Sequence, residues 1–324
     1  MAELPHPAQC PEQHGHAKLG GHQMEFGTDS LGNTKAQAGH NRISDRLIEL
    51  TPARIAGFHT MDQQSQQSGY KTMGRARREL SAAPGSFVWH DLYSSDAEES
   101  GAFLRRMFGW YSKTLGRRTL LTCGALHTAG IVSVAKDPTS HPGLWRPHLR
   151  VANVDECAAR ARMIGGRVVK APEGIPGLDR HAEIADPIGA SLVIADGTLD
   201  RRTVGESTIS WDELHTSDPR VSGTFWTSLF GWSTDWVVSG KDPVAVFLNG
   251  GTRVASMRRT ANTLFDRADR WVPYIQMAQV ENACAIATGL GAVVTARFHK
   301  DALLNDAAIL REPGGAEIGV CGHV

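Results

Sequence analysis

The sequence has 324 residues, of which 41% are hydrophobic and 21% charged, a composition typical of a globular protein of two or three domains. Its 34 basic and 34 acidic side chains cancel, so we expect a small-molecule partner rather than nucleic acid or a membrane surface. The sequence contains no apolar run of about 18 residues, and its five cysteines have no CxxC spacing, which favours free thiols and a cytoplasmic location.

The first 84 residues differ in composition from the rest of the chain. Gln, His, Gly, Ser and Pro are abundant there, aromatic residues are few, and apolar periodicity is nearly absent. A segment of this kind buries too little apolar surface to offset the entropy cost of ordering it. Its six histidines do not place three imidazoles on one face of a regular element, which favours a solvated tail over a metal site. We therefore expect residues 1–84 to form a mostly disordered N-terminal extension.

An internal repeat organises the remaining residues. Residues 89–110 read WHDLYSSDAEESGAFLRRMFGW and residues 211–232 read WDELHTSDPRVSGTFWTSLFGW, with ten of these 22 positions identical. The second half of the repeat aligns at a constant offset of 126 residues, for example from Trp145 to Trp271. A repeat of this length defines the architecture before any single residue is interpreted.

The first half of each copy is predicted to be a strand followed by a helix. Residues 87–93 alternate apolar and polar side chains, as a half-buried strand does. Asp96 then stands at the N-cap of a helix, and Glu99 three residues on completes a capping box. In the second copy, Asp218 takes the same place and Pro219 occupies the first helical position. Strand then helix is therefore predicted twice.

Further strands and a second helix follow in each copy. In the first copy the candidate strands are residues 119–127, 130–136 and 145–154, and the next helix ends at Gly165, as a C-terminal glycine would make it do. Residues 181–196 supply the last strands of this copy. The same order recurs in the second copy, so we expect four βαβββ units in the chain.

The repeated motifs resemble those of a known superfamily. The strand–Asp–helix–FGW segment, the VxxVD sequence before the second helix and the DPxGA turn are similar to the vicinal oxygen chelate superfamily, which includes glyoxalases, bleomycin-resistance proteins and extradiol dioxygenases. The resemblance covers about residues 85–324. It implies an α+β protein with tandem modules at residues 85–200 and 206–324 and with curved mixed sheets around cavities. One fold hosts many reactions, so the reaction must be inferred from the site.

Members of this superfamily typically bind a divalent metal, which acts as a Lewis acid, through His and Glu side chains on facing strands. Carried over residue by residue, the three ligand positions hold no usable donor: they are Trp89, Arg146 and Val193 in the first copy, and Trp211, Val272 and Gly319 in the second. We therefore expect no metal cofactor. A slip of one residue would bring His90 to the first position, although the ungapped match of Trp89 with Trp211 argues against it. A divalent metal stays as the alternative.

Strand alternation identifies the side chains that share a face with the two tryptophans. Asp91 and Tyr93 follow Trp89 on that face, and Glu213 and His215 follow Trp211. The same face of the later strands carries a different group in each copy: Arg146, His148 and Arg150 in the first, and Val272, Tyr274 and Gln276 in the second.

These side chains suit a planar organic ligand that is handled without a metal. Asp91 and Glu213 are candidates for a general base, and His148 and His215 for a general acid. The candidate ligand-binding residues are the aromatic and basic side chains of the same face: Trp89, Tyr93, Arg146, Arg150, Trp211 and Tyr274. For each residue, core packing or a structural hydrogen bond is the alternative role.

The sequence therefore predicts a protein that binds a small aromatic or polycyclic molecule, either as a sequestering protein or as a metal-free tailoring enzyme. The alternative is a metal-dependent lyase, isomerase or extradiol dioxygenase of the same superfamily. A third interpretation is a dimerisation scaffold without a ligand. The repeat is compatible with a monomer of pseudo-two-fold symmetry or with a homodimer.

Overall fold

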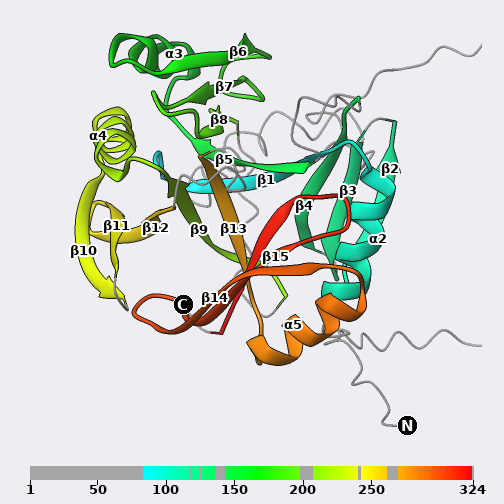
Figure 1. The fold of residues 1–324 in the computed structure, drawn as a ribbon. Coiled ribbons are helices and arrows are strands. Elements are labelled where there is room, and N and C mark those ends of the chain that lie inside the picture. The colour runs from blue at the N-terminus through cyan, green and yellow to red at the C-terminus, as the bar shows by residue number, and fades with distance from the viewer. Residues whose placement is uncertain are drawn as a thin grey trace, which may run out of the picture. The chain divides into compact units, whose positions relative to one another are not determined.

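The computed structural model describes residues 83–116, 118–124, 126–135, 143–197, 207–239, 242–260 and 269–322. The predicted N-terminal extension, residues 1–84, lies outside the described residues except for its last two positions. The described chain forms two eight-stranded sheets, each accompanied by two helices (Figure 1). The α+β class and the four βαβββ units predicted from the sequence are confirmed.

The first module consists of two βαβββ units whose strands form one sheet in the order β2-β3-β4-β1-β5-β8-β7-β6. Its elements are β1 (Phe87–Ser94), α2 (Ala97–Phe108), β2 (Tyr111–Leu115), β3 (Arg118–Cys123), β4 (Leu126–Ser133), β5 (Gly143–Arg150), α3 (Val154–Met163), β6 (Arg167–Glu173), β7 (His181–Ala185) and β8 (Ser191–Ala195).

The second module repeats this topology in the order β10-β11-β12-β9-β13-β16-β15-β14. Its elements are β9 (Ile209–Thr216), α4 (Pro219–Phe230), β10 (Ser233–Ser239), β11 (Asp242–Asn249), β12 (Thr252–Arg259), β13 (Arg270–Gln276), α5 (Val280–Gly289), β14 (Val293–Asp301), β15 (Asn305–Arg311) and β16 (Glu317–Cys321).

The centre of each sheet joins its two βαβββ halves. Strand β1 pairs antiparallel with β5 and parallel with β4, and β9 pairs in the same way with β13 and β12. In this register Asp91 lies opposite Gly130, and Glu213 lies opposite Ser256. Asp91 and Glu213 therefore occupy the same place in the two modules.

The helices begin and end where the sequence predicts. The side chains of Asp96 and Asp218 accept backbone N–H groups of the first turns of α2 and α4, and Pro219 occupies the first turn of α4. Both helices end on a glycine with positive φ, Gly109 (68°) and Gly231 (71°), a conformation in which a side chain would be strained.

One predicted strand boundary is wrong. The sequence suggested strands at residues 119–127 and 130–136, but β3 ends at Cys123 and β4 begins at Leu126. Gly124 adopts φ 57°, which suits the tight turn between the two strands better than continued extended chain. The predicted strand continued through this turn because the pattern of apolar residues does not change there.

Each sheet has one face packed against its helices and an opposite face, called here the inner face. In the first module, Leu92, Ile131 and Trp145 pack in one core with the side chains of α2. The same core includes residues of α5, such as Cys284, so the two modules share it. Because successive side chains of a strand alternate between the faces, Asp91 and its neighbours at even spacing lie on the inner face.

The cysteines only partly match the expectation of free thiols. Cys157, Cys284 and Cys321 are free, and the latter two are buried. Cys123, however, is disulfide-bonded, which corrects the expectation for that residue. Among the helices of the described residues, none has the length and apolar character needed to cross a membrane.

Candidate functional site

The inner face of the first module carries a polar cluster centred on Asp91. The Trp89 indole donates from Nε1 to Asp91 Oδ1 at 3.0 Å, and His148 Nε2 lies 3.1 Å from Asp91 Oδ2. Arg118, on β3, donates to the same Oδ2. Asp91 is 1% exposed, whereas the Trp89 and His148 residues are half-buried and 43% of the Arg118 side chain is exposed. The carboxylate is therefore enclosed by groups that themselves reach solvent.

The charges of this cluster are set by their neighbours. Burial raises the pKa of the Asp91 carboxyl, but the hydrogen bond with His148 and the charges of His148 and Arg118 outweigh it and lower the pKa to about 2. Burial lowers the pKa of His148 below its usual range, although its hydrogen bond with Asp91 acts in the opposite direction. At neutral pH the pair is therefore a carboxylate and a neutral imidazole.

A second ion pair continues along the same face. Arg146 Nε lies 2.5 Å from Glu183 Oε1, and Ser191 Oγ donates to that oxygen at 3.1 Å. The Arg146 guanidinium lies 6.0 Å from the centre of the Tyr93 ring. Burial, followed by the charges of Asp91 and Glu183, raises the pKa of Tyr93, so its hydroxyl stays protonated at neutral pH. Tyr93 therefore presents a neutral hydroxyl beside a guanidinium.

The remaining predicted basic residue of this face, Arg150, is held at the end of β5. Its Nη1 donates to the Gly197 carbonyl at 2.7 Å. The structure thus brings Trp89, Asp91 and His148 into direct contact, and it places Arg150 on the same face toward the end of β8.

In the second module the equivalent carboxylate is fully enclosed. Glu213 accepts hydrogen bonds from Ser256 Oγ (3.0 Å) and Tyr274 Oη (3.0 Å), lies 2.9 Å from His215 Nε2, and pairs with Arg258 Nε at 3.3 Å. The Glu213, His215 and Tyr274 residues are 0%, 2% and 0% exposed. A ligand from solvent would reach none of these groups without a displacement of the residues that cover them.

The charges of the second cluster are strongly stabilised. Burial raises the pKa of Glu213, but the hydrogen bond with His215 and the charge of Arg258 outweigh it and lower the pKa to about 2. Burial, and then the Glu213 charge, raises the pKa of Tyr274 well above its usual value. Every oxygen of Glu213 therefore has a fixed partner inside the module.

One small residue explains why the hydrogen-bond patterns of the two clusters differ. A Cβ atom at Gly130 would lie 2.3 Å from Asp91 Oδ1, so only glycine leaves room for the direct contact between Trp89 and Asp91. In the second module Ser256 takes this place, and its hydroxyl bridges Trp211 Nε1 (2.8 Å) to the carboxylate.

A turn covers the second inner face. Leu303 and Leu304, between β14 and β15, belong to the same buried apolar cluster as Trp211 and Tyr274. Asp301 accepts the backbone N–H groups of both leucines at 2.9 and 3.0 Å. The turn is thus fixed in position by its own aspartate and by apolar burial.

The residues described on the inner faces do not fit the superfamily's divalent metal. Trp89 lies opposite His148, which pairs with Val193, and Asp91 lies opposite Arg146. The first row continues from Val193 to Glu183, whose carboxylate already binds Arg146, and the Asp91 carboxylate is already paired with the Arg118 guanidinium. Among the described residues, no group of three His, Cys, Asp or Glu side chains could hold a metal ion.

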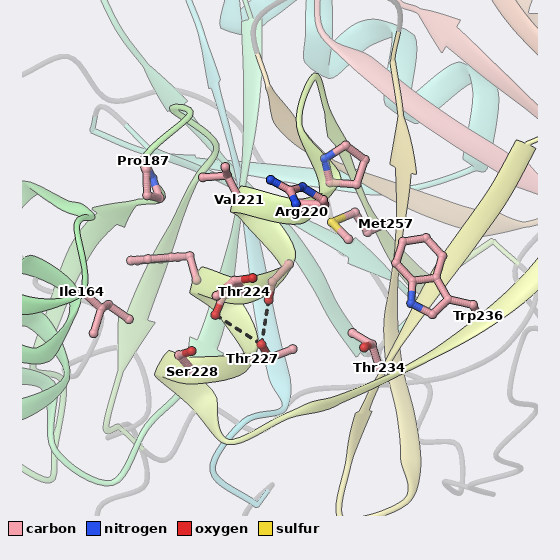
Figure 2. A pocket seen from close by; sticks show the side chains of 13 residues that line it. Ile164, Pro187, Arg220, Val221, Thr224, Thr227, Ser228, Thr234, Trp236 and Met257 are labelled. Atoms are coloured by element: carbon pink, nitrogen blue, oxygen red, sulfur yellow. Dashed lines mark hydrogen bonds between the residues drawn. The ribbon is translucent and has the colours of Figure 1, made fainter.

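A cavity of about 610 Å³ has no residue of either cluster in its described lining (Figure 2). It is lined by residues of α4, β10 and β12 together with Ile164 and Pro187 of the first module. Among the described residues of this lining, Arg220 is the one titratable side chain, and the Thr227 hydroxyl donates to the Gly223 carbonyl at 2.7 Å. Without an acid and a base, this cavity is a poorer candidate for catalysis than the Asp91 cluster.

Several members of the two clusters were missed in the sequence. Arg118 was overlooked because its contact with Asp91 depends on the order of strands β3, β4 and β1, which one sequence does not reveal. Arg258 and Asp301, joined at 2.7 Å, come from strands at opposite sides of their sheet. Glu183, which binds Arg146, was not among the site residues predicted from the sequence.

Comparison with known proteins agrees with the fold. A family model described as a glyoxalase-like domain matches residues 209–321. The anthracycline biosynthesis protein DauV of Streptomyces sp. (strain C5) is 27% identical over 170 residues, which cover 46% of this chain and 62% of DauV. The chain thus spans less than two thirds of the length of that relative.

Two solved structures share the architecture. The Mn(II)-bound glyoxalase from Novosphingobium aromaticivorans has a TM-score of 0.52 at 14% identity, over 73% of this chain and 82% of that one. The 2,2',3-trihydroxybiphenyl 1,2-dioxygenase from Sphingomonas wittichii strain RW1 has a TM-score of 0.51 at 13% identity, over 75% of this chain and 92% of that one. At such identities the likeness concerns the fold alone. Residues 209–321 therefore match a glyoxalase-like domain, within a tandem fold that is similar to those of these two structures.

Proposed function

We propose that the inner face of the first module binds a planar, polycyclic organic molecule without a metal, for sequestration or for a metal-free tailoring reaction. The observation that carries this proposal is the half-buried Trp89 indole fixed beside the Arg118–Asp91–His148 cluster. The similarity to a protein of anthracycline biosynthesis agrees with a polycyclic aromatic ligand.

The ligand would meet an aromatic surface and several polar groups. An indole held by a hydrogen bond to Asp91 offers a preoriented face for stacking, worth about 0.5–1.5 kcal/mol beyond the area that it buries. The exposed part of the Arg118 side chain and the neutral Tyr93 hydroxyl would orient carbonyl or phenol oxygens of the ligand. This combination of one apolar wall and few directed polar groups is typical of small-molecule sites.

If the protein is an enzyme, His148 is the better proton acceptor of the pair. The carboxylate of Asp91 accepts the hydrogen bond, so the neutral His148 carries its proton on Nε2. Its Nδ1 is then unprotonated and can accept a proton. Asp91, with a pKa of about 2, is a weak base but would stabilise the imidazolium that forms. This assignment reverses the roles of base and acid that the sequence suggested for these two residues.

The second module serves a structural role in this proposal. Trp211, Glu213, His215 and Tyr274 were predicted as site residues, and that prediction would require the turn above them to move. Their hydrogen bonds are satisfied within the module, which is what a buried polar network needs in order to stabilise a fold.

Fluorescence titration tests the proposal. Tag-free full-length protein treated with EDTA is titrated with 1,4-dihydroxyanthraquinone, and the quenching of tryptophan emission gives Kd. We expect Trp89→Leu to raise Kd about tenfold, equivalent to about 1.4 kcal/mol, and Trp236→Leu to leave it unchanged. Trp236 is exposed and lines the separate cavity, so it is the matched control.

Two results would contradict this function. One is a Kd that depends on Trp236 and not on Trp89, which would place the ligand in the separate cavity. The other is a stoichiometric divalent metal in the purified protein whose removal abolishes binding, which would favour the metal-dependent alternative.

A further inference from the structure

The turn that covers the second inner face has an open counterpart in the first module. The counterpart lies between β6 and β7, at residues 174–180. At the repeat offset of 126 residues, Leu178 corresponds to Leu304. Leu304 is 0% exposed over the Glu213 cluster, whereas Leu178 is 48% exposed and its neighbour Ile175 is 61% exposed. The same element is thus closed in one module and open in the other.

The closed turn is held over the carboxylate by an ion pair whose two positions are apolar in the open turn, which is tied instead to α3 by Arg180 and Asp155 at 2.6 Å. Asp301 binds Arg258 at 2.7 Å, and Arg258 in turn binds Glu213. At the repeat offset, Ile175 takes the place of Asp301. Val132 takes the place of Arg258, since Val132 lies opposite Tyr93 as Arg258 lies opposite His215. Two apolar side chains in these positions cannot form an ion pair equivalent to Asp301–Arg258.

The open turn borders the proposed site. A Cβ atom at Gly197 would lie 2.6 Å from the Leu178 carbonyl oxygen, so the turn and the end of β8 are in close contact. The carbonyl of Gly197 accepts the hydrogen bond from Arg150 of the inner face at 2.7 Å. Gly174 and Gly177 adopt φ of 91° and 74°, so the turn contains two residues without side-chain restriction of the backbone. Each is tied by one hydrogen bond, to Arg180 and Asp196 respectively, that closure would have to exchange.

We propose that residues 174–180 form a lid that closes over the ligand at Trp89 and places Leu178 and Ile175 on it. The inference rests on the proposed function. The second module displays the closed form, in which Leu303 and Leu304 occupy the space over the carboxylate that a ligand would fill in the first. Burial of two exposed apolar side chains against an aromatic ligand supplies the attraction that the Asp301–Arg258 pair supplies in the second module.

Hydrogen exchange of the full chain tests the lid without any ligand. In the wild-type protein we expect the amides of residues 174–180 to exchange faster than those of 301–304. Introducing the ion pair into the first module with Val132→Arg and Ile175→Asp should slow exchange at 174–180 by tenfold or more. The control Val132→Arg with Ile175→Asn, which lacks the carboxylate, should not slow it. Exchange unchanged by the charged pair would overturn the lid.

A second variant covers the case in which the double variant fails to fold. Asp301→Asn keeps the side-chain oxygen that accepts the Leu303 and Leu304 amides but removes the charge that binds Arg258. We expect exchange at 301–304 to rise toward the rate of 174–180. No change would show that the ion pair does not hold the turn, and the inferred difference between the modules would fail.

Binding measurements then connect the lid to the ligand. With 1,4-dihydroxyanthraquinone bound, exchange at 174–180 should slow, and Leu178→Ala should raise Kd about fivefold, in line with losing part of a buried leucine side chain. Val169→Ala, an exposed apolar residue of β6 outside the turn, should leave Kd unchanged. If Trp89-dependent quenching occurs but neither effect does, the lid is overturned and the proposed function stands. If quenching is absent, the proposed function fails, and the exchange rates of the ion-pair variants still test whether residues 174–180 can close.

Discussion

The two inner faces place a carboxylate at the same point of the same fold and surround it differently. Asp91 is held by groups that reach solvent, including an Arg118 side chain that is 43% exposed. Glu213 is held by more deeply buried groups, among which the Arg258 side chain is 10% exposed and binds Asp301 of the covering turn. The difference teaches that a duplicated fold does not duplicate its site, because a few covering residues decide which carboxylate a ligand can approach.

The largest expected effect separates the two arginines. Arg258→Met leaves Glu213 and Asp301 as buried charges without this partner, and we expect a loss of about 3–5 kcal/mol in the free energy of unfolding. Arg118→Met removes a half-exposed partner of Asp91 and should cost about 1 kcal/mol. Urea titration of both variants measures the two losses in the free energy of unfolding. Equal losses would contradict the distinction between an enclosed and an accessible cluster.

Acid should weaken the protein through the enclosed carboxylate. The pKa of Glu213 is about 2 in the folded protein against an ordinary value of 4.5, so its contribution, about 3 kcal/mol, is complete above pH 4.5 and is lost as the pH falls toward 2. Glu213→Gln should lower stability at pH 7 and flatten the pH dependence between 4.5 and 2. If the wild type and the variant lose stability in parallel over that range, Glu213 is not the group responsible.

Binding should depend on one of two similar arginines. Arg118→Met should raise the Kd for 1,4-dihydroxyanthraquinone about tenfold, because its guanidinium orients the ligand oxygens in our proposal. The control is Arg311→Met, which removes an arginine with a side chain 38% exposed that binds Glu317 in the second module. Equal effects of both variants would indicate a nonspecific charge contribution.

The smallest expected effect concerns the two tryptophans that open the repeat. Trp89 is half-buried and Trp211 is 7% exposed. Trp89→Phe should therefore reduce the quenching of tryptophan emission by acrylamide more than Trp211→Phe does. A larger reduction from Trp211→Phe would show that the second inner face is the more accessible one.

Local features of the fold were predictable from the sequence. The N-cap aspartates and the terminal glycines are consequences of neighbouring residues, and they are confirmed. The predicted alternation over residues 87–93 holds from Trp89 onward, because the register of β1 shifts between Phe87 and Trp89. The break at Gly124 was missed because an apolar run can continue through a turn without a change in pattern.

The difference between the two clusters was not predictable in the same way. Asp91 and Glu213 look equivalent in the repeat, and two features separate them: Gly130 against Ser256, and a pair of residues 43 positions apart, Arg258 and Asp301. The covering turn also depends on Lys300 and Asn305, which adopt φ of 51° and 58° without being glycines. Such backbone conformations are imposed by tertiary contacts and leave little trace in a single sequence.

The most direct test of the account is the number of ligand molecules bound per chain. Isothermal titration of EDTA-treated full-length protein with 1,4-dihydroxyanthraquinone should give one site per chain, weakened by Trp89→Leu and not by Trp236→Leu. Two equivalent sites per chain, or one site unaffected by Trp89→Leu, would contradict the claim that the first inner face is the accessible one.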